Sequence, residues 1–248
     1  MAPTAFVTGG TGFVGANLVR LLLDQGYAVR ALIRPNSRLD NLQGLPVELV
    51  AGDLTDANLA THMHGCNYLF HVAAHYSLWR KDRDVLYQSN VVGTRNVLAA
   101  ARAAGIERTV YTSSVAAIGV KVGGIADETY QSPVAQQEAI QAIATGQDIV
   151  IVNPSTPIGP WDIKPTPTGD IVLRFLRRQM PFYLNTGLNL VHVQDVAWGH
   201  LLALQKGKTG DRYILGHQNL LLKTMLDRLA DLTGLPAPQQ SIPAWIPL

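Results

Sequence analysis

The chain has 248 residues, of which 47% are hydrophobic and 15% charged, a composition that excludes a disordered or fibrous protein. The formal net charge is +2 and the basic residues are scattered, so we predict no nucleic-acid partner. Cys66 is the single cysteine, which excludes an intrachain disulfide and predicts a reducing, cytoplasmic location. We expect neither a signal peptide nor a transmembrane segment, because no apolar stretch is long enough to cross a bilayer.

Short runs rich in β-branched residues alternate with longer helical patterns along the first part of the chain. Six strands are predicted, at 5–8, 28–33, 47–51, 68–72, 108–113 and 149–153. Two helical patterns, 13–25 and 91–104, end at Gly26 and Gly105. Most of the strands are apolar throughout, as strands must be when helices cover both faces of a sheet. The pattern therefore predicts an α/β fold with a doubly wound parallel sheet.

The stretch "VTGGTGFVG" at 7–15 joins the first predicted strand to the first helix. Gly10, Gly12 and Gly15 form G-x-G-x-x-G, and Gly9, Gly12 and Gly15 form an overlapping G-x-x-G-x-x-G. Such a turn lets the backbone approach a pyrophosphate, while the N-terminus of the helix offers free N–H groups. An ordinary tight turn is the alternative, but the position between strand and helix favours a dinucleotide-binding Rossmann fold.

The end of the second strand selects between the two nicotinamide cofactors. A site for NAD places an acidic residue there to hold the ribose 2′-hydroxyl. This chain reads "ALIRPNSR", with Arg34 at that place and Arg38 shortly after it, and guanidinium groups can bind a 2′-phosphate. We therefore predict NADP(H), with NAD as the second choice. The alternative is that both arginines simply face water.

Six motifs occur in the order found in one known family. They are "VTGGTGFVG", "GDL" at 52–54, "LFHVAA" at 69–74, "NVVGTRNV" at 90–97, "VYTSS" at 110–114 and "HVQDVA" at 192–197. Together they resemble the extended short-chain dehydrogenases/reductases, also called the NAD-dependent epimerase/dehydratase family. The stretches at 153–169 and 188–200 are most similar to hopanoid-associated sugar epimerases, a branch close to dihydroflavonol reductases.

The resemblance implies a set of cofactor-binding residues along the carboxyl edge of the sheet. That set is Gly9, Gly12, Phe13, Val14, Gly15, Arg34, Asp53, Leu54, Ala73 and Pro154. Asp53 and Leu54 match the pair that borders the adenine ring. Ala73 belongs to the "HVAA" that ends the fourth strand beside the ribose, and Pro154 matches the segment that lies against the nicotinamide.

The resemblance also implies a catalytic serine and an activity. Ser114 matches the serine whose hydroxyl hydrogen-bonds the substrate oxygen and supports proton transfer. Ser113 is the fallback, since a shift of one residue in a strand turns the other side chain inward. The implied activity is that of an NAD(P)-dependent oxidoreductase or epimerase acting on a carbonyl or secondary alcohol of a small molecule. A nucleotide-linked sugar is the expected substrate, and a ketone like those of dihydroflavonol reductases is the alternative.

One catalytic feature of the family is missing. These enzymes use Tyr-x-x-x-Lys as the acid/base pair, and no tyrosine of this chain has a lysine four residues later. Tyr76 with Arg80 and the lone Tyr130 are weak substitutes. The flanks "DETYQSP" and "AQQEA" match the family, with only Val134 between them, so we expect residues to be missing immediately before Ala135. If the pair is truly absent, the protein is a non-catalytic NADP(H)-binding module.

Four residues are candidates for contact with the substrate: His75, Tyr76, Trp79 and His192. The first three follow the carboxyl end of the fourth strand, where open α/β sheets bind ligands. A role in closing the core, or a structural hydrogen bond at His192, is the alternative. His62 and His64 lack an acidic or cysteine partner at a suitable spacing, so we predict no metal site.

The chain is expected to divide after the sixth strand. We predict a Rossmann core at 1–153, a smaller substrate-facing lobe at 154–184 and 216–248, and a segment at 185–215 that partly returns to the core through short strands. The apolar ending "IPAWIPL" predicts that further residues normally cover it. A homodimer is a further prediction from the resemblance.

Overall fold

The computed structural model describes residues 2–75, 82–119, 127–129 and 136–242. Several subjects of the sequence predictions lie outside these ranges: Tyr76, Trp79, Arg80, Tyr130, the junction between Val134 and Ala135, and the apolar ending "IPAWIPL" from residue 243 on. Within the described ranges, no helix combines the length and the apolar character needed to cross a membrane.

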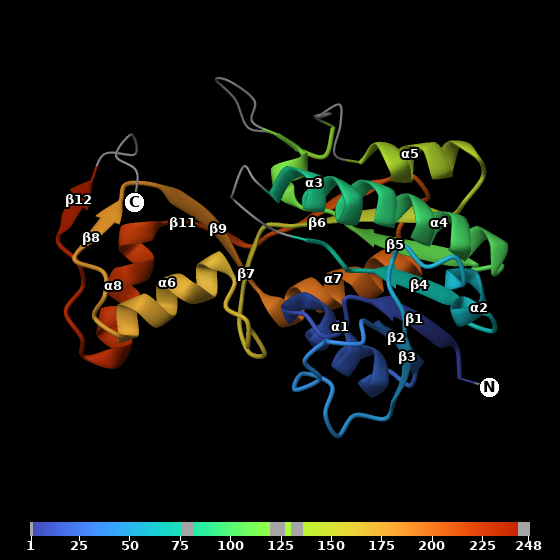
Figure 1. The fold of residues 1–248 in the computed structure, drawn as a ribbon. Coiled ribbons are helices and arrows are strands. Elements are labelled where there is room, and N and C mark those ends of the chain that lie inside the picture. The colour runs from blue at the N-terminus through green and yellow to red at the C-terminus, as the bar shows by residue number, and fades with distance from the viewer. Residues whose placement is uncertain (1, 76–81, 120–126, 130–135, 243–248) are drawn as a thin grey trace.

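Seven parallel strands form the main sheet of the described chain, in the order β10-β6-β5-β4-β1-β2-β3. They are β1 (Thr4–Thr8), β2 (Ala28–Ile33), β3 (Val47–Ala51), β4 (Tyr68–His71), β5 (Arg108–Thr112), β6 (Ile149–Pro154) and β10 (Arg212–Leu215). The strand order reverses between β1 and β4, which makes this the point where open α/β sheets bind ligands. The doubly wound sheet predicted from the sequence is confirmed, with β10 as a seventh strand beyond the six expected (Figure 1).

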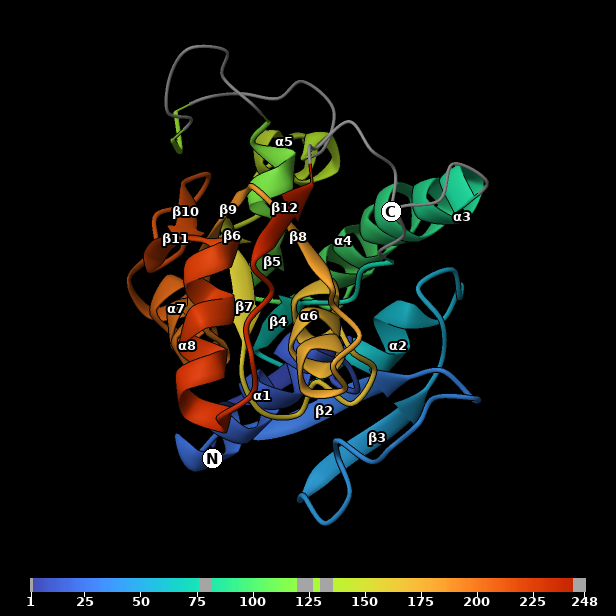
Figure 2. The ribbon, with the colours of Figure 1, turned by 90° about the vertical axis from the view of Figure 1, so that its left-hand side faces the viewer.

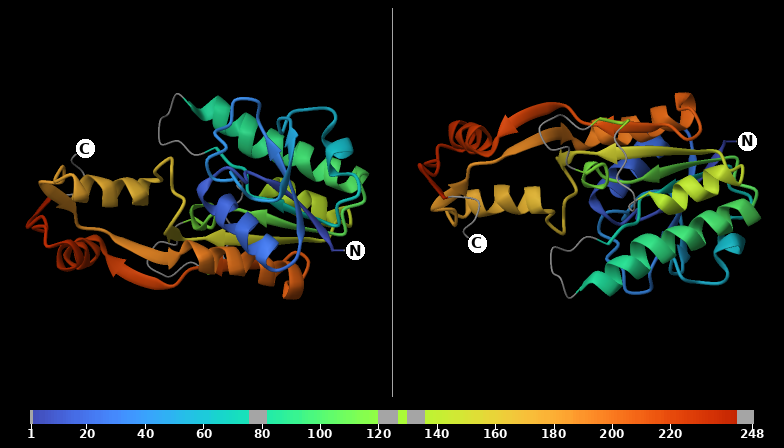
Figure 3. Two further views of the ribbon diagram at one scale, coloured as in Figure 1. Left: turned by 90° about the horizontal axis from the view of Figure 1, so that it is seen from below. Right: turned by 90° about the horizontal axis from the view of Figure 1, so that it is seen from above.

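Helices cover both faces of this sheet, as the apolar strands require (Figure 3). One face carries α1 (Phe13–Asp24) and α7 (Val193–Lys206), which pack against each other. The other carries α2 (Leu59–Met63), α4 (Gly93–Ala103) and α5 (Gln137–Ala144). Both layers bury alanine, leucine and valine side chains against the strands, and β3 forms one edge of the sheet (Figure 2).

One predicted helix starts differently from the expectation. The pattern at 91–104 forms α4 only from Gly93, because residues Gln88–Val92 form a π-helical turn that follows α3 (Arg83–Tyr87). A π-helical turn inside a helix is uncommon and often marks a functional site. Hydrophobic periodicity cannot reveal it, since a single wide turn changes the spacing of only a few side chains.

A small lobe lies beyond the carboxyl end of β6, on the left in Figure 1. Its elements are β7 (Thr156–Ile158), α6 (Pro167–Leu176), β8 (Phe182–Leu184), β9 (Gly187–His192), β11 (Gln218–Leu221), α8 (Leu222–Thr233) and β12 (Gln240–Ile242). Strands β11, β9 and β7 form a three-stranded sheet, and β12 pairs with β8. The chain leaves the main sheet after β6 and returns to it at β10, and we keep the division at residue 153 as a proposal.

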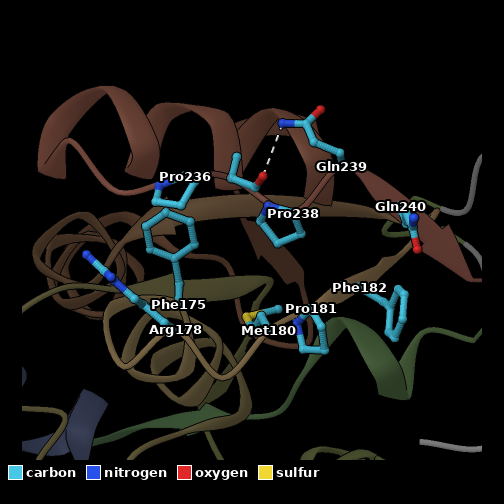
Figure 4. A pocket seen from close by; sticks show the side chains of 10 residues that line it. Phe175, Arg178, Met180, Pro181, Phe182, Pro236, Pro238, Gln239 and Gln240 are labelled. Carbon is cyan, nitrogen blue, oxygen red and sulfur yellow. Dashed lines mark hydrogen bonds between the residues drawn. The ribbon is translucent and has the colours of Figure 1, made fainter.

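The lobe contains a hollow of about 520 Å³ at the end of α6 (Figure 4). Its lining includes Phe175, Met180 and Phe182 on one side and Pro236 and Pro238 on the other. Arg178 also lines it and has a left-handed backbone, with φ +58°.

Candidate active site

The glycine loop approaches the backbone of β4 very closely. Gly9 has φ +73°, and a side-chain carbon added there would lie 2.6 Å from the Ala73 nitrogen. A carbon added at Gly15 would lie 2.1 Å from the Gly9 carbonyl oxygen, whereas one at Gly10 would have its nearest neighbour at 3.4 Å. Gly9 and Gly15 are therefore positions that only glycine can occupy, whereas Gly10 is not, and this favours the pattern of Gly9, Gly12 and Gly15 over the one that starts at Gly10.

The N-terminus of α1 is open toward this loop. Gly12 caps the helix without a side chain, and its N–H donates to the Gly9 carbonyl at 2.9 Å. The first turn, Phe13 to Gly15, contains no acidic residue. No side chain caps the N–H groups of that turn, so they and the positive end of the helix dipole are available to an anion.

A buried polar network joins β1 to β4 directly under the loop. The His71 ring bonds Thr8 Oγ1 through Nδ1 at 2.7 Å and Thr94 Oγ1 through Nε2 at 3.0 Å. Thr8 Oγ1 also accepts a hydrogen bond from the Ala73 N–H at 3.2 Å. Burial lowers the pKa of His71 to about 4, so its imidazole is neutral near pH 7. This network was not predicted from the sequence, although a histidine in the apolar "LFHVAA" is a signal that could have indicated it.

The end of β2 opens onto a hollow of about 460 Å³ lined by Arg34, Pro35, Asn36 and Asp53. Arg38 pairs with Asp40 at 3.1 Å, so its charge is already matched. The exposed Arg34 guanidinium forms no ion pair with any residue that the structure describes. Of the two predicted arginines, Arg34 is thus the one available to a ligand.

Asp53 and Leu54 lie on the loop after β3. The Asp53 carboxylate accepts hydrogen bonds from the Thr55 N–H at 3.1 Å and the Thr55 hydroxyl at 2.9 Å, which orders its own turn. Leu54 contacts α4 so closely that a side-chain carbon added at Gly93 would lie 3.1 Å from it. Both residues are therefore held in place beside the hollow that Arg34 lines.

The loop after β4 is fixed by one asparagine of the π-helical turn. Asn90 accepts a hydrogen bond from the His75 N–H at 2.7 Å and donates one to the His75 carbonyl at 2.8 Å. The π-helical turn and these two bonds thus occur at the same residue, at the end of β4. His75 is thus held at the carboxyl edge of the sheet.

The two candidate serines follow β5 and differ in their partners. Ser113 Oγ accepts a hydrogen bond from the buried Gln136 side chain at 3.0 Å. Ser114 Oγ accepts one from the Ala116 N–H at 3.2 Å, and its carbonyl accepts one from Asn153 of β6 at 2.8 Å. Among the described residues, the hydroxyl of Ser114 bonds only within its own turn, whereas that of Ser113 is bonded to Gln136, so the geometry favours Ser114 for contact with a substrate.

Tyr111, which lies in the same strand region as the candidate serines, is not suited to replace the missing acid/base pair. Tyr111 of β5 is 8% exposed, and burial raises its pKa, the opposite of what an acid/base tyrosine needs near neutral pH. Tyr130 and the junction before Ala135 lie outside the described residues.

His192 has a structural contact of its own. It caps α7, and its Nδ1 accepts a hydrogen bond from the Gln194 N–H at 3.3 Å. A side-chain carbon added at Gly159 would lie 3.3 Å from His192 Nε2, so this ring lies beside the loop after β7. Substrate contact by His192 remains a prediction. Within the described ranges, no three His, Cys, Asp or Glu side chains gather as a metal site.

Comparison with known proteins decides the family. The NAD dependent epimerase/dehydratase family matches residues 5–216. The chain belongs to this family. A Synechocystis sp. relative that bears the name dihydroflavonol 4-reductase is 67% identical over 266 residues, covering 100% of this chain and 78% of the relative. "Sterol demethylase protein B" of Methylococcus capsulatus is 38% identical over 97% of this chain and 77% of its own length. The crystal structure of gox2253 superposes with a TM-score of 0.91 and 43% identity, covering 97% and 78% of the two chains.

Family membership makes the protein an NAD(P)-dependent epimerase or reductase, which confirms the resemblance seen in the motifs. The alignment with the Synechocystis relative spans 266 residues, although this chain has 248. The alignment therefore contains at least 18 positions that the relative fills and this chain does not. That number is large enough to hold a Tyr-x-x-x-Lys segment.

Proposed function

We propose that the protein is an NADP(H)-dependent oxidoreductase acting on a carbonyl or secondary alcohol of a small molecule. The observation that carries this proposal is the glycine loop at the switch point of the sheet, with Arg34 beside it, which forms no ion pair within the described part of the chain. NADP(H), when bound, supplies or accepts the hydride. NAD is the second choice for the cofactor.

The chain's own residues divide into phosphate, adenosine and nicotinamide contacts. The N–H groups at the start of α1 would hold the diphosphate, and Arg34 would hold the 2′-phosphate. Asp53 and Leu54 would border the adenine, while Ala73, fixed through Thr8, would lie beside the ribose. Pro154, buried at the end of β6, would lie against the nicotinamide.

On the substrate side, we assign Ser114 to hydrogen-bond the reacting oxygen, with Ser113 as the fallback. His75, Tyr76, Trp79 and His192 would line the substrate. A nucleotide-linked sugar remains the first candidate. A ketone is the second, supported by the name of the Synechocystis relative. The two differ in cofactor use, since a ketone reductase consumes NADPH and an epimerase interconverts its substrates without net consumption.

A titration with both cofactors tests the proposed cofactor. We expect Arg34→Asp to weaken NADPH binding at least about tenfold, a change of 1.4 kcal/mol, while NADH binding is kept or improved. Arg38→Asp is the matched control, because Arg38 already pairs with Asp40 and should change neither affinity much. Equal loss for NADPH and NADH in Arg34→Asp would contradict the assignment.

The missing Tyr-x-x-x-Lys favours a second candidate function, a non-catalytic NADP(H)-binding module. Peptide mapping across Val134 and Ala135 of protein made from the natural gene distinguishes the two. A peptide with additional residues there, containing Tyr-x-x-x-Lys, supports the enzyme. A peptide that runs directly from Val134 to Ala135, together with NADPH binding and no turnover on sugars or ketones, supports the module.

We further propose a cytoplasmic location and a homodimer. Cys66 is buried and burial raises the pKa of its thiol, which suits a chain that does not form disulfides. Cell fractionation tests the location and sedimentation velocity tests the dimer.

A further inference from the structure

Residues 159–162, which we call the latch segment, lie between β7 and α6 and contact α1. Asn17 of α1 donates hydrogen bonds to the Pro160 carbonyl at 3.0 Å and to the Phe13 carbonyl at 2.9 Å. The Arg20 guanidinium lies 3.6 Å from the centre of the Trp161 ring, a cation–π contact. The segment that leads into the small lobe is therefore attached to the helix that begins at the glycine loop.

A single buried amide extends this attachment to the loop itself. Asn41 is fully buried, and its Nδ2 donates to the Thr11 carbonyl at 3.0 Å and to the Trp161 carbonyl at 3.1 Å. Its Oδ1 is also buried and receives no hydrogen bond from any residue the structure describes, which is unfavourable for folding. The bridge between Thr11 and Trp161 is thus the feature that accounts for an asparagine at this position.

Trp161, whose carbonyl accepts the hydrogen bond from Asn41, has an unusual backbone conformation. Its φ is +73°, a left-handed conformation that a bulky residue rarely adopts. Such outliers persist only where surrounding contacts hold them, and they gather at functional sites. Here the contacts are the Asn41 amide on the carbonyl and Arg20 on the ring.

From Trp161 the contacts continue into the lobe. The Asp162 carboxylate accepts hydrogen bonds from the Thr166 N–H at 3.0 Å and from the Thr166 hydroxyl at 2.7 Å. Thr166 in turn caps α6, accepting a hydrogen bond from the Gly169 N–H at 3.2 Å. A continuous set of short polar contacts therefore joins the glycine loop to the first helix of the small lobe.

We propose that the latch segment couples cofactor binding to the substrate lobe. A diphosphate bound at the glycine loop fixes the Thr11 carbonyl, and Asn41 transmits that order to Trp161 and so to α6. Asn41 and Trp161 are positioning residues, since neither is placed against the cofactor. This inference rests on the proposed function, because it takes NADP(H) as the ligand of the loop.

Hydrogen–deuterium exchange of the whole protein, with and without saturating NADP⁺, tests the coupling. In the wild type, NADP⁺ should slow exchange in the first turn of α1, and in α6 by at least about fivefold. In Asn41→Ala and in Trp161→Gly, saturating NADP⁺ should still slow exchange in α1, but the slowing in α6 should be lost. Trp161→Gly keeps the carbonyl that accepts from Asn41, but it removes the ring contact with Arg20 and frees the backbone, so the carbonyl is no longer held in place. Because it also removes the strain of the left-handed backbone, it provides a folded variant if Asn41→Ala fails to fold.

Two matched variants control for a general loss of stability. Asn67→Ala removes hydrogen bonds to Thr4 and Glu107 at the opposite edge of the sheet. Trp198→Phe alters a tryptophan of α7 that is 43% exposed, the same fraction as Trp161. In both variants, NADP⁺ should still slow hydrogen exchange in α6.

The possible results separate this proposal from the proposed function. The coupling is overturned, while cofactor binding stands, if NADP⁺ slows hydrogen exchange in α1 but not in α6 of the wild type. It is also overturned if NADP⁺ slows exchange in α6 of both latch variants as much as in the wild type. If NADP⁺ slows neither helix, the proposed function fails and the coupling fails with it. Slowing of α6 that depends on both Asn41 and Trp161 supports the coupling.

Discussion

The two buried histidines make stability depend on pH in a defined direction. His71 and His200 are at most 1% exposed, and burial lowers the pKa of each from 6.5 to about 4. His71 bonds two threonines, and His200 bonds Thr112 at 2.8 Å and the Val196 carbonyl at 2.7 Å. Between pH 4 and 6.5 the unfolded chain binds protons that the folded chain does not. The free energy of unfolding is therefore highest above pH 6.5 and falls as the pH is lowered toward 4.

The magnitude follows from the size of the pKa change. A lowering from 6.5 to about 4 corresponds to about 3 kcal/mol when complete, and to about 2 kcal/mol for each histidine between pH 7.5 and pH 5. The two together should lower the free energy of unfolding by about 4 kcal/mol over that range. Carboxylates of the unfolded chain remain mostly ionised at pH 5, so the histidines dominate the change.

Urea unfolding followed by circular dichroism at several pH values between 5 and 7.5 measures this change. His71→Gln and His200→Gln should each remove about half of the pH dependence, and His217→Gln on the surface is the control. A free energy of unfolding that differs by less than about 1 kcal/mol between pH 5 and pH 7.5 would refute the reasoning. So would a His71→Gln variant that keeps the full dependence.

Three further predictions concern the glycine loop, the candidate serine and the lobe. Gly15→Ala should weaken NADPH binding at least about tenfold in a fluorescence titration, because the added carbon would lie 2.1 Å from the Gly9 oxygen. Gly26→Ala, with φ +81° and open space around it, should keep NADPH binding and cost about 1 kcal/mol of stability. In protein shown to turn over, Ser114→Ala should lower kcat about 100-fold with an unchanged Kd for NADPH, and an unchanged kcat would exclude this serine. Arg178→Gly should raise the free energy of unfolding by about 1 kcal/mol in urea titrations, and no gain would show that its left-handed backbone is unstrained.

The sequence predicted the sheet because its strands are short, apolar and separated by helical patterns of the right length. Strand β10 was expected only as a partial return to the core, since half-buried "RYIL" does not show which sheet it joins. The π-helical turn at Gln88–Val92 was missed for a related reason. It contains Asn90, which bonds His75 after β4, and that contact depends on the packing of two elements rather than on local sequence.

In the site, too, features that depend on local sequence could be predicted, and features that depend on packing between distant elements could not. The glycine motif could be found because its function requires bare backbone at fixed spacing, yet the choice between Gly9 and Gly10 needed the approach of Ala73 from another strand. Asn41 and Trp161 could not be found at all. They are 120 residues apart in sequence. Nothing in the local sequence around either residue indicates that the Asn41 side-chain amide donates a hydrogen bond to the Trp161 carbonyl.

The absent Tyr-x-x-x-Lys separates two properties that the family normally combines. The groups assigned to the cofactor lie in the loop after β1, on α1, just after β2, β3 and β4, and at the end of β6. None of them lies between β5 and α5. Helix α5 still packs Ala139 and Ala142 against Ile149 of β6, so the sheet is covered with or without additional residues before Ala135. Fold stability should therefore be nearly the same in this chain and in a form that carries the pair. The resemblance implies that the lysine of the pair holds the ribose hydroxyls, so NADPH should bind both forms, and more tightly the form with the pair. Hydride transfer should be confined to that form, and turnover by this chain without the pair would contradict the separation.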